Sequence, residues 1–152
     1  MSTLFISDVR SILDFVSPVW NLGFLGQNRL LESVQHRWTK QITRLSDLPY
    51  SDRLSTLGLF SVMGRMLRQD LVYCYRIFHN LSIISPSDIF TMSPMVGTRG
   101  HRFKIQMQHS HCEVRRHFFS CRIVQKWNSL PHDIVDAPSL PTFKSRLQSF
   151  FR

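Results

Sequence analysis

The run Cys112-Glu-Val-Arg-Arg-His-Phe-Phe-Ser-Cys-Arg-Ile-Val-Gln-Lys-Trp-Asn-Ser-Leu-Pro131 decides the fold of the C-terminal half of this chain. Successive residues of an α-helix are rotated by about 100°. A helix over about 116–129 therefore places four large apolar side chains on one side: Phe119, Ile123, Val124 and Trp127. Three basic residues follow the edge of that side: Arg115, Arg122 and Lys126. We predict a helix that buries its apolar face in a core and keeps a stripe of cations in water.

The same region carries most of the net charge. Residues 99–126 hold seven Lys or Arg against one acid, Glu113, and so contribute +6 to the net charge of +9 of the 152-residue chain. A solvated helix face is the ordinary explanation of such a stretch. The single sign of the charge favours an anionic partner instead, with nucleic acid first, an acidic protein second and a membrane surface third.

Four helices are expected upstream. They cover residues 3–16, about 27–44, a short segment that ends at Leu57 with Gly58 as its C-cap, and about 61–79 with Ser61 as its N-cap. The second helix has the clearest pattern. An apolar arc that includes Leu30, Val34 and Trp38 is predicted to pack against the core. A separate arc contains no acid, and its members are Arg29, His36, Arg37, Lys40 and Arg44.

The fold class predicted is mainly α, a helical bundle with a small β-hairpin between the fourth helix and the C-terminal helices. Residues 102–107 alternate polar and apolar side chains, which is typical of a strand, and Cys112–Arg115 is expected to return as its partner. Ser139 is predicted to cap a final helix. The expected domains are 1–80 as a four-helix unit, 81–100 as a loop or linker, and 101–152 as the hairpin with two helices.

The sequence contains no motif that predicts catalysis. It has no G-x-S-x-G, P-loop or H-E-x-x-H, and no pair of its ten acids is placed to hold two magnesium ions. A cluster of possible zinc ligands contains no C-x2-C pair and lies among cations, which repel a dication: His109, His111, Cys112, His117 and Cys121. We therefore predict no cofactor and no metal. Three cysteines favour free thiols in a reducing compartment, and neither a signal peptide nor a membrane span is predicted.

Six motifs give the chain a specific resemblance. In order they are Ser17-Pro-Val-Trp-Asn21, Leu30-Leu-Glu-Ser-Val-Gln-His-Arg-Trp-Thr-Lys40, Arg53-Leu-Ser-Thr-Leu-Gly-Leu59, Thr98-Arg-Gly-His101, Phe118-Phe-Ser-Cys-Arg-Ile-Val-Gln-Lys-Trp-Asn-Ser-Leu-Pro131 and Ser139-Leu-Pro-Thr-Phe-Lys-Ser-Arg-Leu147. Together they resemble the C-terminal region of the reverse transcriptase of jockey-type, LINE-like non-LTR retrotransposons. The resemblance implies a thumb and post-thumb region that grips the template–primer during target-primed reverse transcription.

The family's Tyr-x-Asp-Asp motif and its metal-binding carboxylates lie upstream of this region and are absent here. No catalytic residue is therefore carried over from the family. The resemblance also implies that Met1 falls inside the family's coding region. We accordingly expect a truncated or decayed element, or a captured fragment with a host role.

The function predicted is non-catalytic binding of RNA and DNA, as template–primer or RNA–DNA hybrid, through phosphate contacts. The alternative is an inert or protein-interaction fragment whose apolar faces packed on missing upstream polymerase domains. The residues predicted to bind nucleic acid are Arg29, Arg37, Lys40, Arg44, Arg99, Arg102, Lys104, Arg115, Arg116, Arg122 and Lys126.

Overall fold

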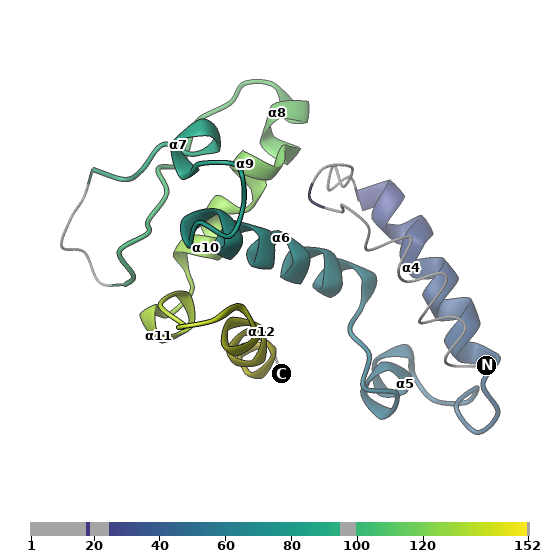
Figure 1. Ribbon diagram of the computed structural model, residues 1–152. Coiled ribbons are helices and arrows are strands. Elements are labelled where there is room, and N and C mark those ends of the chain that lie inside the picture. Colours follow the sequence, from purple (N-terminus) through teal and green to yellow (C-terminus); the bar gives the residue numbers. More distant parts are fainter. Residues whose placement is uncertain (1–17, 19–24, 95–99, 152) are drawn as a thin grey trace. The chain divides into compact units, whose positions relative to one another are not determined.

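The computed structural model describes residues 18, 25–94 and 100–151 (Figure 1). The helix expected over 3–16, the motif around Trp20 and the candidate Arg99 lie outside these described residues. Helices dominate the described part of the chain, which confirms the mainly α prediction. They are α4 Leu25–Lys40, α5 Tyr50–Thr56, α6 Val62–Phe78, α7 Pro86–Ile89, α8 Glu113–His117, α9 Phe119–Arg122, α10 Val124–Asn128, α11 His132–Val135 and α12 Leu140–Phe150.

The chain divides into two compact units, Met1–Leu67 and Arg68–Arg152. The division falls inside α6, whereas the sequence predicts a boundary after residue 80 and a linker over 81–100. The described part of that linker belongs to the second unit and contains α7. Whether the ranges 1–80, 81–100 and 101–152 behave as separate domains stays a prediction.

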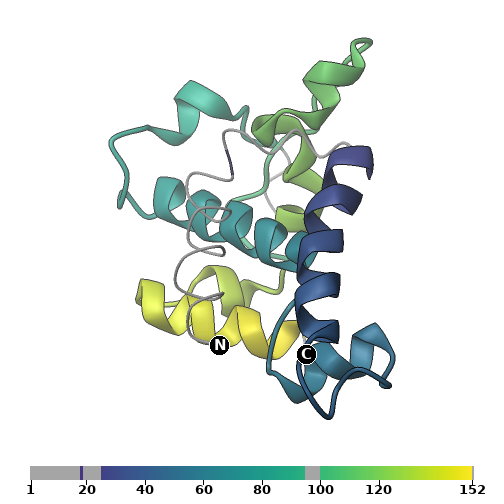
Figure 2. The ribbon, with the colours of Figure 1, turned by 90° about the vertical axis from the view of Figure 1, so that its right-hand side faces the viewer.

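In the first unit, the helix ends follow the predicted capping residues. The amide of Gly64 donates to the Ser61 hydroxyl over 3.0 Å, which makes Ser61 the N-cap of α6. Gly58 follows α5 with a φ of 63°, a left-handed conformation that suits glycine after a helix. Helix α4 ends at Lys40 rather than at residue 44, and Arg44 adopts a φ of 77° in the turns that follow. Figures 1 and 2 both show α5 beside the C-terminal end of α4.

The buried side of α4 is polar, which corrects the predicted packing face. Gln35 and Thr39 are buried, whereas Leu30 is 70% exposed and Val34 is 46% exposed. The Gln35 side-chain amide donates to the Tyr50 hydroxyl over 3.1 Å and to the carbonyl of Phe60 over 3.0 Å. Buried polar groups need such partners, so hydrogen bonding rather than apolar periodicity determines which side of α4 faces inward.

Aromatic side chains build the core of the second unit. The Phe78 ring stacks between Phe90, at a centroid distance of 5.6 Å, and Trp127, at 5.3 Å. Tyr75 stacks on Phe143 from α12, with centroids 4.3 Å apart. The later turns of α6 are thereby packed against α10 and α12 (Figure 1). Each buried ring of this size removes 150–250 Å² from water, so this cluster supplies much of the unit's stabilisation.

The predicted β-hairpin is wrong: no strand is formed within the described residues. Cys112 precedes a helix, α8, and the 102–107 segment pairs instead with residues 91–93, in the middle of the predicted loop. An isolated antiparallel bridge joins Met92 to Ile105, and the Gln106 amide donates to the carbonyl of Thr91 over 2.8 Å. On its other side, Ile105 is bound by the Asn128 side chain, which accepts from its amide over 3.0 Å and donates to its carbonyl over 2.8 Å. An asparagine side chain therefore replaces the second strand.

The predicted helix over 116–129 is interrupted. Phe118 takes an extended backbone conformation, with ψ of 147°, and separates α8 from α9 and α10. The apolar face was predicted correctly, because its four members are all buried: Phe119, Ile123, Val124 and Trp127. The guanidinium of Arg122 donates to the carbonyl of His117 over 2.9 Å and so provides a partner for the backbone at the interruption.

Candidate nucleic-acid interface

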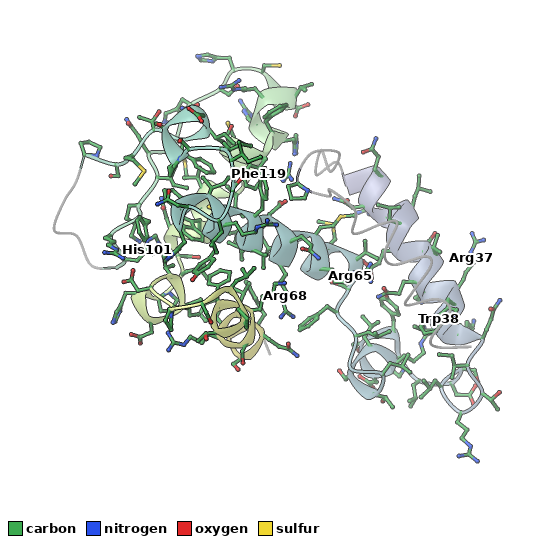
Figure 3. All side chains as sticks on the ribbon, in the orientation of Figure 1. Arg37, Trp38, Arg65, Arg68, His101 and Phe119 are labelled. Atoms are coloured by element: carbon green, nitrogen blue, oxygen red, sulfur yellow. The ribbon has the colours of Figure 1, made fainter. Side chains whose placement is uncertain are left out.

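A row of cations lies on the exposed surface of α4. Arg29, Arg37 and Lys40 are all exposed and fall within about 80° on the helix. The side chain of Arg37 extends away from α4 in Figure 3. Arg44, in the turns after the helix, is also exposed. Within the described residues, none of these four side chains forms an ion pair or a hydrogen bond. We call Arg29, Arg37, Lys40 and Arg44 the α4 cation row.

The acid on α4 does not neutralise this row. Glu32 is half-buried, and both of its carboxylate oxygens have partners inside the unit. Oε1 accepts a hydrogen bond from the Tyr50 hydroxyl, and Oε2 accepts one from the amide of Val62 over 2.9 Å. The second bond places a negative charge at the N-terminus of α6, where the helix dipole favours it. The only acid of α4 is therefore used to join helices, and the cation row keeps its charge.

Beside the row, His36 contacts a buried arginine of α5. The guanidinium of Arg53 donates to the backbone carbonyl of His36 over 3.3 Å and lies 3.1 Å from His36 Nε2. Tyr50 packs against both residues, with its ring centroid 4.9 Å from that of His36 and 5.5 Å from Arg53 Cζ. Burial, followed by the hydrogen bond to Glu32, raises the pKa of Tyr50. The phenol is therefore neutral at physiological pH.

Sequence reasoning did not single out Arg53 as a site residue. A signal was present, because a helix over 50–56 places Arg53 on the same face as Tyr50 and Leu54. Leu54 is buried, so an arginine on that face is directed into the unit. A charged residue on an otherwise apolar helix face is the pattern that points to it.

The candidate Arg122 is held inside the second unit. Its Nε and Nη2 donate to the two carboxylate oxygens of Asp70, each over 2.9 Å, and the two side chains are only 14% and 4% exposed. Burial raises the pKa of Asp70, and the adjacent guanidinium opposes that shift. A bidentate pair of this kind fixes Arg122 as a structural cation, so the predicted phosphate contact from this residue is not supported by its position.

The other candidates of the second unit differ in how strongly they are held. Arg102 forms an exposed ion pair with Asp136 over 3.3 Å, and the ammonium of Lys104 donates to the carbonyl of Asn128. Arg116 is exposed, and its Nε donates to the carbonyl of Ser110 over 2.9 Å. Two further candidates are exposed and make no side-chain contact with another described polar group: Arg115 and Lys126.

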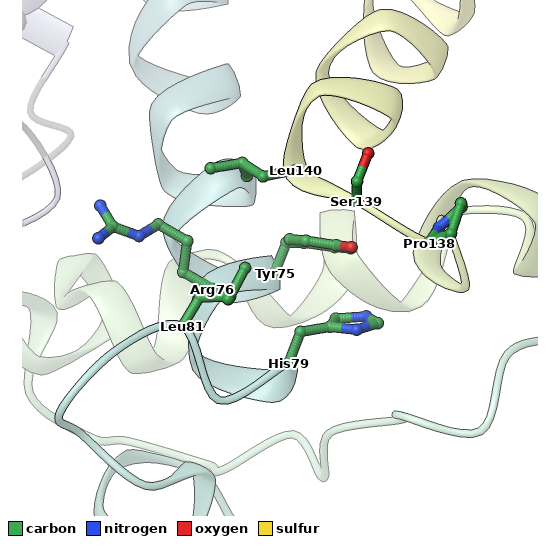
Figure 4. A pocket seen from close by; sticks show the side chains of 7 residues that line it. All are labelled: Tyr75, Arg76, His79, Leu81, Pro138, Ser139 and Leu140. Carbon is green, nitrogen blue, oxygen red and sulfur yellow. The ribbon is translucent and has the colours of Figure 1, made fainter.

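A hollow of about 540 Å³ lies between α6 and the start of α12 (Figure 4). Its lining residues are Tyr75, Arg76, His79, Leu81, Pro138, Ser139 and Leu140. The Tyr75 hydroxyl donates to the carbonyl of Ala137 over 2.7 Å, and His79 Nε2 donates to that of Val135 over 2.9 Å. Ser139 caps α12. The polar groups of Tyr75, His79 and Ser139 therefore already form hydrogen bonds that stabilise the fold. They are not oriented to bind a ligand in the hollow.

The described residues hold no group of three or more His, Cys, Asp or Glu side chains that could bind a metal ion. Cys112 is exposed, whereas Cys74 is buried, and burial raises the pKa of its thiol well above the usual range. Across the described segments, no helix has both the length and the apolar composition needed to cross a bilayer.

Comparisons with known proteins do not assign this chain to a family. The sequence matches no protein-family model, no curated protein and no solved structure.

Proposed function

We propose that this chain binds nucleic acid without sequence preference, through contacts to phosphate groups. We further propose that it does so as a non-catalytic C-terminal fragment of a non-LTR retrotransposon reverse transcriptase, with RNA–DNA hybrid or template–primer as its ligand. The observation that carries the binding proposal is the α4 cation row, which is exposed and uncompensated within the described residues. The resemblance of six ordered sequence motifs is the sole support for the retrotransposon origin.

The dimensions of the row suit a nucleic-acid strand. Arg29 and Lys40 are eleven residues apart on α4, which corresponds to about 16 Å along the helix axis. Each strand of a duplex advances 3.4 Å per nucleotide along its axis, so the row spans about five nucleotides. Each cation that neutralises a phosphate releases condensed counterions, and this release drives binding that ignores the base sequence.

The test compares two double variants with the same change of net charge. Arg37→Gln/Lys40→Gln removes two cations of the row. Arg76→Gln/Lys144→Gln removes two exposed cations of the second unit that are not candidates. In a fluorescence-anisotropy titration of labelled RNA–DNA hybrid against salt, the first variant should bind more weakly, with a slope of log affinity against log salt that is shallower by about 2. The second should retain the wild-type slope. Equal losses in the two variants contradict the assignment.

A second candidate function is a protein-interaction or inert fragment. Large apolar side chains on the surface favour it: Leu30 is 70% exposed, Phe118 is 54% exposed and Ile83 is fully exposed. Such side chains would be covered by partner domains in a larger protein. This function predicts self-association of the isolated chain in size-exclusion chromatography. A clean monomer counts against it.

A further inference from the structure

Arg53 is a buried cation without an anionic partner in the described part of the chain. The residue is 3% exposed, and its guanidinium contacts the carbonyl and the ring of His36. Its Nε has no hydrogen-bond partner among the described residues. Buried arginines are normally paired with a carboxylate, because an unpaired buried charge is strongly destabilising.

The nearby groups that could supply a negative charge do not. Both oxygens of Glu32 are bound elsewhere, to the Tyr50 hydroxyl and the Val62 amide. The Tyr50 phenol keeps its proton, because its pKa is raised. Asp52 is exposed and accepts a hydrogen bond from the Ser51 hydroxyl over 3.0 Å. The Tyr50 ring, 5.5 Å from Arg53 Cζ, gives only a cation–π contact, which is weaker than an ion pair.

The protonation state of His36 follows from its contact with Arg53. A guanidinium is always protonated and only donates hydrogen bonds. His36 Nε2, 3.1 Å from Arg53 Nη2, must therefore accept, so the ring is neutral and carries its proton on Nδ1. The exposed ring occupies the place that an anionic oxygen takes beside an arginine. His36 also lies one helical turn before Lys40, a member of the α4 cation row.

We infer that Arg53, His36 and Lys40 form a binding site for one phosphate group of the nucleic-acid strand, in which a phosphate oxygen replaces the His36 ring as the acceptor for Arg53. The inference rests on the proposed function for the source of the phosphate. The bound phosphate supplies the negative charge that Arg53 lacks. It also fixes the register of the strand on α4, because a bidentate guanidinium is a more directional contact than an exposed lysine.

The experiment follows the Arg53 Nε–H signal of the full chain by NMR while inorganic sulfate is added. Sulfate serves as a probe of the anion site that carries no base or sugar. In the wild-type chain the signal should shift saturably. His36→Ala removes the competing acceptor, so it should bind sulfate at least about threefold more tightly. His109→Ala, an exposed histidine of the second unit, is the matched control and should behave as wild type.

A second variant tests whether the acceptor itself competes with the anion. His36→Gln keeps an acceptor beside Arg53, so it should bind sulfate as the wild type does. An Arg53 signal that sulfate leaves unmoved in both wild type and His36→Ala overturns the inference, even if the chain binds hybrid with a steep salt dependence. A saturable Arg53 shift without any binding of hybrid supports the anion site and refutes the proposed function instead.

Discussion

Replacing Arg122 with alanine tests whether this candidate cation is structural. The change removes both hydrogen bonds to the Asp70 carboxylate and leaves that group, whose side chain is 4% exposed, without its cation. It also removes the donor to the carbonyl of His117. Removing one partner of a buried ion pair typically costs 3–5 kcal/mol, because the remaining charge is left unpaired. We expect the free energy of unfolding to fall by about 3–4 kcal/mol at neutral pH.

The measurement is urea unfolding followed by circular dichroism, with Lys126→Ala as the matched control. Lys126 is an exposed cation of the next helix, so its loss should change stability by no more than about 0.5 kcal/mol. Without Arg122, burial alone acts on the pKa of Asp70 and raises it further, so protonation should relieve the unpaired charge and the difference from wild type should shrink as the pH falls. Asp70→Leu/Arg122→Leu should recover most of the loss. A cost below about 1 kcal/mol for Arg122→Ala refutes the reasoning.

Three further predictions concern the fold. Asn128→Ala unpairs the amide and carbonyl of buried Ile105 and should lower the free energy of unfolding by about 2–4 kcal/mol in urea; Asn128→Asp should retain part of the loss. Burial lowers the pKa of His101, so the unfolded chain binds its proton first and stability should decline as pH falls below about 6.5, less so in His101→Gln. The single variants Leu30→Gln and Val34→Gln should each lower the free energy of unfolding by less than about 0.5 kcal/mol in thermal melts, because both side chains are exposed. A loss above about 2 kcal/mol in either variant would show that this face is packed.

Local signals predicted the helices of this chain better than their packing. The caps at Ser61 and Ser139 lie where the sequence placed them, because a hydroxyl that accepts from a backbone amide acts over a few residues. The buried face of 119–127 was also correct, since its large apolar residues leave no other inward side. The inward face of α4 was not predictable in the same way. Gln35 faces inward because its amide bonds to Tyr50 and Phe60, and periodicity carries no information on such distant partners.

The same limit applies to the candidate site, because the sequence indicates which residues are charged but not which partners they meet. The helical periodicity of this segment indicated an arc of positively charged residues, and Arg29, Arg37 and Lys40 are exposed in the structure. The same reasoning did not indicate the buried ion pair of Arg122, because its partner Asp70 is 52 residues away. It also missed the contact of Arg53 with His36, which joins two helices. Composition can indicate an anionic partner, but only tertiary structure determines which cations are free to meet it.

The most direct test of the central claim is the salt dependence of binding to RNA–DNA hybrid by the wild-type chain. Six candidate cations are exposed and form neither an ion pair nor a side-chain hydrogen bond within the described residues: Arg29, Arg37, Lys40, Arg44, Arg115 and Lys126. Six neutralised phosphates give a slope of log affinity against log salt of about −5, and the α4 cation row alone gives about −3.5. We predict a slope between these values, the same for hybrids of unrelated sequence. Binding that is absent, or a slope shallower than about −1, would contradict the account.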